Sequence, residues 1–223
     1  MAAKKSGLGR GLDSLFAENA TDNNSTAQLR LSEIEPNRDQ PRKHFDEEAL
    51  SELAASIKEH GLLQPIVVRP MPGGTYQIVA GERRWRASRL AELNKVPVII
   101  KDLSDKEAME LALIENLQRR DLNPVEEAEG YNRLMQEFRL TQEQVAERVG
   151  KSRPAVTNAL RLLNLPGDQL QALSEGKISA GHARALLAFK QPENEQEAYI
   201  AALNGASVRQ IEAMAKAEGK AKA

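Results

Sequence analysis

Residues 81–87 of the sequence, Gly-Glu-Arg-Arg-Trp-Arg-Ala, place three arginines beside one glycine. The segment follows residues 76–80, which have the composition of a strand, and it opens a helix-like stretch that reaches Leu93. A glycine at a strand-to-helix turn lets the backbone approach a ligand closely, and the first N–H groups of a helix can bind an anion. Arginine adds a fixed positive charge whose planar fork matches phosphate oxygens. The segment therefore predicts a phosphate-binding site.

Three other segments carry side chains that could complete such a site. Residues 36–42 form a loop that holds glutamine and arginine between prolines. Residues 61–65, Gly-Leu-Leu-Gln-Pro, directly precede an expected strand, and residues 115–119, Glu-Asn-Leu-Gln-Arg, end an expected helix. We expect these segments to converge with residues 81–87.

The last of these segments is the candidate for a metal ion. Oxygen ligands such as Glu115 and Asn116 can bind Mg²⁺ when phosphate oxygens and water supply the other ligands, and a helix C-terminus tolerates a cation. The i,i+4 spacing of Glu115 and Arg119 also fits an ordinary salt bridge. The chain has no Walker-type Gly-x-x-x-x-Gly-Lys loop and no Gly-x-Gly-x-x-Gly motif. The residues alone therefore indicate an anion site and do not name a nucleotide.

A second region, residues 141–163, has the pattern of a helix-turn-helix. Thr141 and Gln144 are spaced as a capping box, Gly150 suits the tight turn, and Ser152 suits the cap of a second helix that has Pro154 in its first turn. The residues expected to face the core are Val145, Ala146, Val149, Val156, Leu160 and Leu163. An ordinary helical hairpin is the alternative interpretation.

Polar side chains on the outward face of the second helix favour a DNA-binding role. The N-terminal part of a recognition helix enters the major groove, where such side chains can bond base edges or phosphates. A later helix start near residues 178–184 adds a histidine and an arginine, which alone would more often be surface residues. The predicted DNA-binding residues are Lys151, Ser152, Arg153, Thr157, Asn158, Arg161, His182 and Arg184.

Composition limits the function classes. The absence of cysteine excludes disulfides, thiolate metal sites and cysteine nucleophiles. No apolar run approaches the roughly 20 residues that span a bilayer, so we expect a cytoplasmic protein. The net charge of −1 hides an asymmetry, because residues 139–165 carry five basic and two acidic residues, whereas residues 101–137 carry ten acidic and five basic ones.

The pattern of elements predicts an α+β chain of 223 residues with two domains. Residues 1–28 are expected to be a flexible tail, residues 29–121 a small α/β nucleotide-binding domain, residues 122–215 an all-helical domain with the helix-turn-helix, and residues 216–223 the start of a linker. The expected strands are residues 28–31, 65–69, 76–80 and 96–100. The expected helices are residues 46–59, 84–93, 105–119 and 124–138, then the helix-turn-helix and two to four more.

Together these motifs resemble those of the ParB family of chromosome- and plasmid-partitioning proteins over nearly the whole chain. The matching motifs are Leu8-Gly9-Arg10-Gly11-Leu12, Asn37-x-x-Gln40-Pro41-Arg42, Gly61-x-x-Gln64-Pro65, residues 81–87, Glu115-Asn116-x-Gln118-Arg119 and Gly150-Lys151-Ser152-Arg153. The resemblance implies an N-terminal domain with the fold shared by ParB and sulfiredoxin. It also implies slow hydrolysis of CTP with Mg²⁺, binding to the palindromic DNA site parS, and engagement of two N-terminal domains into a clamp that slides along DNA. The resemblance further implies a ParA-type ATPase as protein partner, a nucleoid-associated location in the cytoplasm and no membrane partner.

The resemblance also assigns roles to residues. The implied nucleotide-binding residues are Gln40, Arg42, Gly61, Gln64, Gly81, Glu82, Arg83, Arg84, Glu115 and Asn116. The implied catalytic residues are Gln40, Arg42 and Glu115, and the implied metal ligands are Glu115 and Asn116. Residues Leu8, Gly9, Arg10, Gly11 and Leu12 correspond to the peptide that stimulates ParA, with Arg10 as its key side chain.

Other functions fit parts of the sequence. A plain dimeric repressor would bind its operator without nucleotide, and its arginines would be structural. A membrane-associated nucleoid-occlusion relative would need an amphipathic N-terminal helix, which Gly7, Gly9 and Gly11 disfavour. Sulfiredoxin activity needs a cysteine that this chain lacks. Family members usually continue into a C-terminal dimerisation domain, which we expect this chain to lack because it stops within a linker-like segment.

Overall fold

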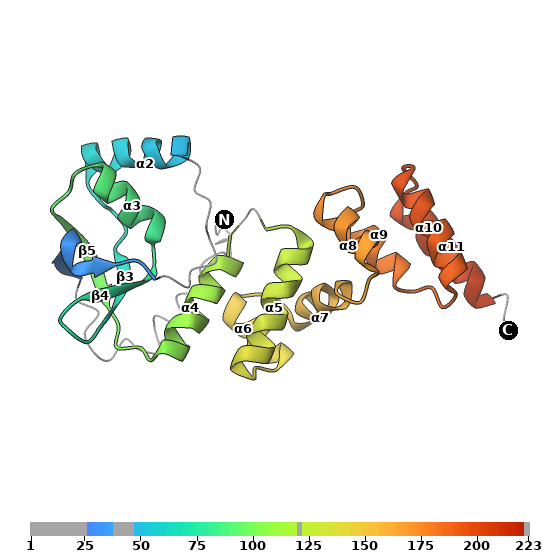
Figure 1. The fold of residues 1–223 in the computed structure, drawn as a ribbon. Helices are drawn as coiled ribbons and strands as arrows, with labels where there is room; N and C mark the ends of the chain where they lie inside the picture. Colours follow the sequence, from blue (N-terminus) through green and yellow to red (C-terminus); the bar gives the residue numbers. More distant parts are fainter. Residues whose placement is uncertain (1–25, 38–46, 120–121, 221–223) are drawn as a thin grey trace, which may run out of the picture. The chain divides into compact units, whose positions relative to one another are not determined.

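The computed structural model describes residues 26–37, 47–119 and 122–220 (Figure 1). Within them the chain forms two compact units that divide between Asn116 and Leu117. The first unit contains β1 (Ala27–Arg30), the 3₁₀ helix η1 (Leu31–Glu33), β2 (Ile34–Glu35), α2 (Glu47–His60), β3 (Ile66–Pro70), β4 (Tyr76–Ala80), α3 (Glu82–Leu90), β5 (Lys95–Ile100) and α4 (Asp105–Leu117). The second contains α5 (Pro124–Phe138), α6 (Gln142–Val149), α7 (Arg153–Leu162), α8 (Gly167–Ser174), α9 (Ala180–Leu186), α10 (Pro192–Leu203) and α11 (Val208–Lys220).

The first unit is built on a mixed five-stranded sheet with the order β1-β5-β3-β4-β2. Strands β3 and β4 form an antiparallel hairpin, in which Gly73 and Gly74 take positive φ angles. Strand β5 runs parallel to β3 and antiparallel to β1, and β2 runs parallel to β4. The expected α/β architecture is confirmed.

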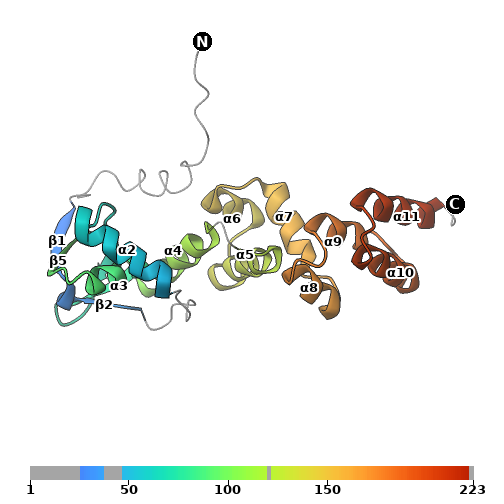
Figure 2. The same cartoon turned by 90° about the horizontal axis from the view of Figure 1, so that it is seen from above.

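Both faces of the central hairpin are covered, because side chains alternate across a strand. Ile66, Val68 and Ile78 pack with Trp85 of α3, whereas Val67 and Val79 pack with Ala108 of α4. Helix α2 packs on α3 through a separate cluster of small and aliphatic residues, and Figure 2 shows the two helices side by side. Helices α3 and α4 are therefore fixed to the sheet by apolar side chains.

The helix boundaries differ from the predictions mainly at C-terminal ends. Strand 76–80 and the cap of α4 by Ser104 and Glu107 are as predicted. Helix α3, however, ends at Leu90 instead of Leu93, because Glu92 adopts a left-handed φ of 58° and the N–H of Leu93 bonds back to Ser88. Helix α4 ends at Leu117, two residues before the predicted end.

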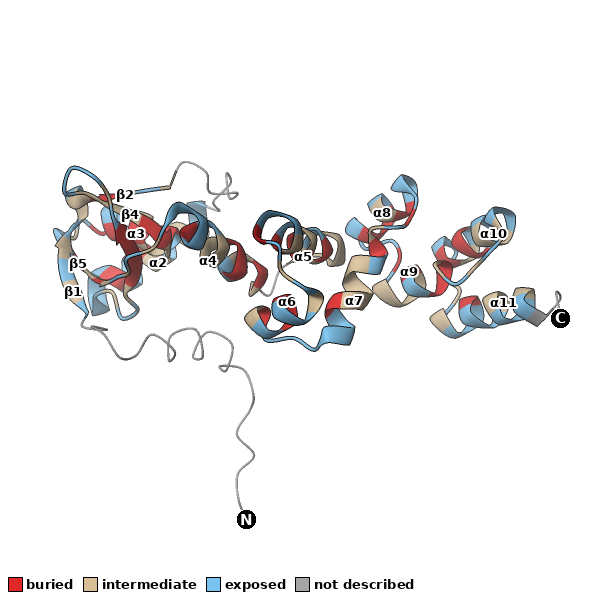
Figure 3. Cartoon of the chain, turned by 90° about the horizontal axis from the view of Figure 1, so that it is seen from below, coloured by how far each residue is buried: buried red, intermediate tan, exposed pale blue. Residues whose placement is uncertain are grey.

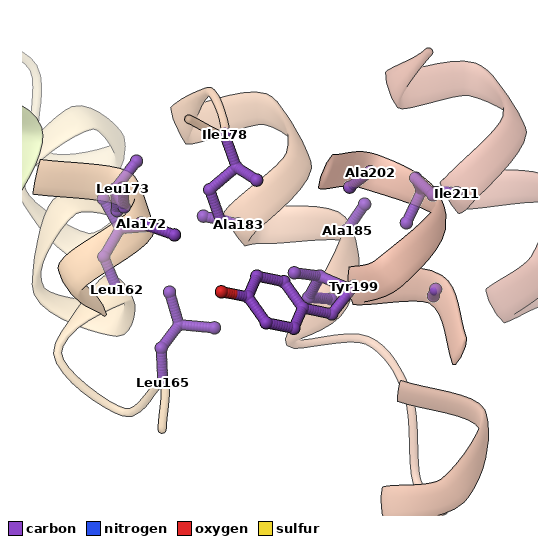
Figure 4. Packing of buried hydrophobic residues seen from close by; sticks show 12 residues of the cluster. Leu162, Leu165, Ala172, Leu173, Ile178, Ala183, Ala185, Tyr199, Ala202 and Ile211 are labelled. Atoms are coloured by element: carbon purple, nitrogen blue, oxygen red, sulfur yellow. The ribbon is translucent and has the colours of Figure 1, made fainter. Parts of the chain in front are cut away.

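The second unit is entirely helical among its described residues. Figure 3 shows buried residues on the inner sides of these helices, and Figure 4 shows one hydrophobic cluster, which joins α7 through α11 around Leu162, Tyr199 and Ile211. Leu162 is buried although it was not predicted to be, whereas Leu160 and Leu163 are only partly buried. The inward face of α7 is thus rotated slightly from the predicted one.

The C-terminal helix continues into the segment that was expected to begin a linker. Helix α11 reaches Lys220, and the Glu218 carboxylate accepts hydrogen bonds from the backbone N–H groups of Lys190 (2.9 Å) and Gln191 (2.8 Å) at the start of α10. In the described part of the chain, every helix is too short or too polar to cross a bilayer.

Candidate functional site

Arg84 links two of the predicted motifs. Its Nη1 atom donates hydrogen bonds to the carbonyl oxygens of Pro65 (2.7 Å) and Gln64 (3.2 Å). Gly81 precedes α3 with a left-handed φ of 99°, and a Cβ atom there would lie 3.3 Å from the guanidinium carbon of Arg84. Glycine is therefore favoured at this position by its backbone angle and by the close arginine. Segments 61–65 and 81–87 converge as predicted.

The surroundings of Arg84 also involve Glu115. Burial lowers the pKa of Arg84 below its ordinary value, and the negative charge of Glu115 acts in the opposite direction. The guanidinium nevertheless remains charged at neutral pH, because arginine is not deprotonated in proteins. A partly desolvated cation attracts an anion more strongly than one in bulk water. Because the charge of Glu115 acts on Arg84, the segment 115–119 shares its surroundings with the segments 61–65 and 81–87.

The neighbouring arginines make different contacts. Arg83 is exposed and donates a hydrogen bond to the carbonyl of Ala49 in α2 (2.9 Å), so it links α3 to α2. Arg86 pairs with Glu82 through a 2.6 Å contact at i,i+4 spacing. Glu82 is only 7% exposed, and its Oε2 atom has no hydrogen-bond partner among the described residues. A buried carboxylate oxygen of this kind suits a donor or a cation brought by a ligand.

The predicted metal ligands lie in the last turn of α4. Glu115 is exposed and Asn116 is half-buried. Among the described residues, no group of three His, Cys, Asp or Glu side chains could hold a metal ion. A magnesium site here would therefore need ligand oxygens from phosphate and water, as the sequence predicted. Gln40, Arg42 and the Leu8–Leu12 motif lie outside the described residues.

A buried arginine that was not predicted from the sequence connects the sheet to helix α4. Arg69 of β3 is 7% exposed, and its guanidinium contacts Gln77 of β4 (2.6 and 2.9 Å) and Asp105 of α4 (2.6 Å). It joins the hairpin to the first turn of α4, the helix that carries Glu115. The available signal was a charged residue directly after the apolar run Ile66–Val68 of the same strand.

The helix-turn-helix has the predicted local geometry. Thr141 and Gln144 form a reciprocal capping box at the start of α6, with distances of 2.9 and 3.3 Å. Gly150 ends α6 with a φ of 69°, and the Ser152 hydroxyl accepts the N–H of Ala155 (3.3 Å) at the start of α7. These caps fix the turn between the two helices.

The predicted DNA-binding residues divide by exposure. Lys151, Ser152, Arg153, Arg161 and Arg184 are exposed, whereas Thr157, Asn158 and His182 are half-buried. The His182 ring lies in the capping box of α9, where its Nδ1 atom faces the N–H of Ser179 at 3.3 Å. Its Nε2 atom is buried without a partner among the described residues. His182 is thus engaged in a helix cap before any DNA is present.

The turn lysine lies close to a carboxylate. The Nζ atom of Lys151 is 3.9 Å from Oε1 of Glu127 in α5, and the same oxygen accepts the Tyr131 hydroxyl at 2.5 Å. Burial, followed by the bond to Glu127 and its charge, raises the pKa of Tyr131 above its ordinary range. The Tyr131 hydroxyl therefore stays protonated and holds the carboxylate beside the turn.

Comparison with known proteins matches both units to one family. Residues 16–117 match the ParB N-terminal domain and residues 120–220 match the ParB HTH domain. The chain is 56% identical over 215 residues to the chromosome-partitioning protein Spo0J of Thermus thermophilus, with 96% of this chain and 78% of that protein covered. It is 49% identical over 220 residues to a probable ParB of Neisseria meningitidis, with 97% and 77% covered. A solved structure of C-terminally truncated ParB from Caulobacter crescentus, complexed to the centromeric parS site, is 45% identical and has a TM-score of 0.76, with 86% of this chain and 99% of that chain covered.

Proposed function

The chain belongs to the ParB family of chromosome-partitioning proteins, and from that membership we propose that it is a CTP-dependent DNA clamp that loads at a parS site. The DNA half of this proposal rests on the helix-turn-helix and on the similarity to the parS-bound Caulobacter protein. The nucleotide half rests on one observation above the others. A partly buried, charged Arg84 lies at the start of α3, beside a glycine whose missing side chain leaves room for the guanidinium.

The residues present fit a nucleoside triphosphate. Arg83 and Arg84 would neutralise phosphate oxygens, and Gly81 leaves room for them to approach the helix N-terminus. By analogy with the family, the Gly61–Gln64 segment would line the base pocket, and the bonds of Arg84 to the Gln64 and Pro65 carbonyls keep that segment beside α3. Glu115 and Asn116 would supply oxygen ligands to Mg²⁺. The Oε2 atom of Glu82, which has no partner in the described part of the chain, would accept a donor from the ligand or face its metal.

Hydrolysis would rest on positioning and charge. Transfer of a phosphoryl group to water needs an oriented water molecule and stabilisation of the charge on the transferred group. When bound, Mg²⁺ would neutralise part of that charge. Arg42 would share this role, and Gln40 or Glu115 would orient the water. Slow turnover suits a switch that must last as long as the clamp encloses DNA.

The remaining roles follow from symmetry and from the family motif. A palindromic site requires a two-fold symmetric reader, so two copies of the chain would pair through their N-terminal domains. The exposed side chains of Lys151, Ser152, Arg153, Arg161 and Arg184 would bind bases and phosphates, together with Asn158 and His182. Thr157 belongs to the same set by sequence. Residues 8–12 would bind a ParA-type ATPase through Arg10.

The test is phosphate release from CTP, ATP, GTP and UTP, each with Mg²⁺ and with a parS duplex, a scrambled duplex or no DNA. We expect hydrolysis to be selective for CTP and stimulated only by parS. Turnover of all four nucleotides would overturn the CTP assignment. Absence of turnover and of CTP binding, with an intact parS footprint, would favour the nucleotide-independent repressor.

A further inference from the structure

Thr157 of the recognition helix α7 is bonded to the preceding helix. Its Oγ1 atom lies 2.7 Å from Oε1 of Gln142, the first residue of α6, and 3.0 Å from the carbonyl oxygen of Arg153. Both side chains are half-buried. The contact joins residues 15 positions apart in sequence across the helix-turn-helix.

The hydrogen-bond inventory of these groups shows how the hydroxyl is used. A threonine hydroxyl has one proton, so it can make one strong bond as a donor. The 2.7 Å separation matches the usual O–H···O distance of about 2.7–2.8 Å and is short for an amide N–H donor. The proton therefore points to Oε1 of Gln142. The contact between the hydroxyl and the Arg153 carbonyl is longer, at 3.0 Å, and is the weaker of the two. A hydroxyl whose proton is used in this way cannot also donate to a base edge.

We propose that Gln142 and Thr157 form a brace that sets the orientation of α7 on α6, so that Thr157 is a positioning residue instead of a base-contacting one. The inference rests on the proposed DNA-binding function and deepens it. Helices α6 and α7 pack against each other, and Val145 of α6 and Val156 of α7 are both 0% exposed. Apolar packing is non-directional, whereas a short hydrogen bond between the first residue of α6 and the second turn of α7 restricts rotation. Base recognition depends on such precision over fractions of an ångström.

The two roles predict different binding profiles. A direct base contact affects one base pair, and its loss relaxes specificity at that pair alone. A brace affects the whole recognition helix, so its loss weakens binding at many positions at once. It also makes the two partners interdependent, because removing either one already breaks the bond.

The experiment is a double-mutant cycle on the 223-residue chain. The variants are Thr157→Val, Gln142→Met and the double variant, with Thr157→Ser as the conservative control that keeps the hydroxyl. Affinity is measured for a parS duplex, for each of its single-base-pair variants and for a scrambled duplex. Melting curves of every variant record the stability of the helical unit. Neither substitution leaves a buried group without a partner, because Gln142 is half-exposed to water and Thr157 retains the Arg153 carbonyl.

We expect each single variant to lower parS affinity by about threefold to tenfold, which corresponds to one ordinary hydrogen bond. The double variant should bind as well as either single one, the loss should be spread over the half-site, and Thr157→Ser should restore affinity. Additive losses, or a loss confined to one base pair in Thr157→Val, would overturn the brace and return Thr157 to base contact. If the unaltered chain shows no preference for parS, the proposed function itself fails. If the two substitutions were non-additive in the melting temperature but not in parS affinity, the bond would be a purely structural contact.

Discussion

In the sheet-containing unit the candidate site is assembled from distant segments, whereas in the helical unit it is formed by neighbours. Arg84 bonds to carbonyl groups 20 and 19 residues earlier in the chain, and Arg83 bonds to one that is 34 residues earlier. The caps that shape the helix-turn-helix, at Thr141 and Ser152, each join residues three positions apart. A substitution at the first site should therefore disturb one ligand through tertiary contacts. A substitution at the second should act through local helix geometry.

The largest effect is expected for Arg84→Ala, which tests whether the two sites are independent. Loss of a charged hydrogen bond to phosphate costs about 1.5–3 kcal/mol, so CTP affinity should fall roughly 10- to 100-fold. Binding to parS should stay nearly unchanged, because Arg84 and its carbonyl partners all lie in the sheet-containing unit. The measurements are CTP titration calorimetry and a parS mobility shift.

Arg89→Ala is the matched control for this experiment. Arg89 lies on the same helix, is exposed, and stacks on Trp85 with 5.0 Å between its guanidinium carbon and the ring centroid. This variant removes the same charge away from the carbonyl cluster and should keep CTP affinity. If Arg84→Ala lost CTP and parS binding to the same extent, Arg84 would be structural and the two units would not be separable.

A smaller effect is expected for Gly81→Ala, which separates backbone strain from the contact with Arg84. A left-handed φ costs a non-glycine residue roughly 1–2 kcal/mol. Gly74→Ala is the control, because Gly74 has a φ of 82° and a Cβ there would meet no atom within 4 Å. Both variants should melt at lower temperature, and only Gly81→Ala should also weaken CTP binding. Equal CTP affinity in the two variants would count against a role for close backbone approach at Gly81.

The same contrast explains which parts of the structure were predictable. Strand 76–80, the caps at Thr141 and Ser152 and the turn at Gly150 follow from residues within a few positions of each other, and all are observed. Because hydrophobic periodicity also acts over short range, the succession of strands and helices was largely predictable. Residues 61–65 and 81–87 could be proposed as partners, but their atomic contacts could not be derived.

Features that depend on tertiary contacts were missed. Arg69 looks like an exposed residue in a strand, and only the packing of α4 on the hairpin brings Asp105 within 2.6 Å of it. The end of α3 was misplaced because Glu92 takes a left-handed angle that usually indicates glycine. The bond between Gln142 and Thr157 crosses 15 residues and has no local sequence signal.

A moderate effect on stability is expected for Tyr131→Phe, which tests the packing of α5 behind the helix-turn-helix. Burial and the bond to Glu127 raise the pKa of Tyr131, so above about pH 10 the unfolded chain loses its proton before the folded one. The contribution of this group is complete below pH 10 and declines as pH rises further. The free energy of unfolding of the unaltered protein should therefore fall more steeply above about pH 10 than that of the variant. Parallel pH profiles would show that the hydroxyl is as well solvated in the folded state as in the unfolded one.

The smallest effect is expected for Glu127→Gln, which shows how far a local charge tunes DNA binding. Lys151 lies 3.9 Å from Glu127, and the two side chains are 53% and 34% exposed, so the pair adds little to stability. The Glu127 carboxylate nevertheless offsets part of the Lys151 charge that a DNA phosphate would meet. Glutamine keeps an acceptor for Tyr131 and removes the charge, so affinity for a scrambled duplex should rise about twofold at low salt and return to normal as salt screens the pair.

Glu137→Gln distinguishes this local effect from a change in net charge. Glu137 lies on the same helix and pairs with Arg133 at 3.0 Å, so the substitution alters the net charge of the chain equally. An equal rise in both variants would mean that only total charge matters. A rise confined to Glu127→Gln would mean that α5 lowers non-specific binding by holding a carboxylate against the turn lysine. Because Lys151 would lose this partner on contact with phosphate, the helical unit would then favour sites where base contacts compensate for the loss.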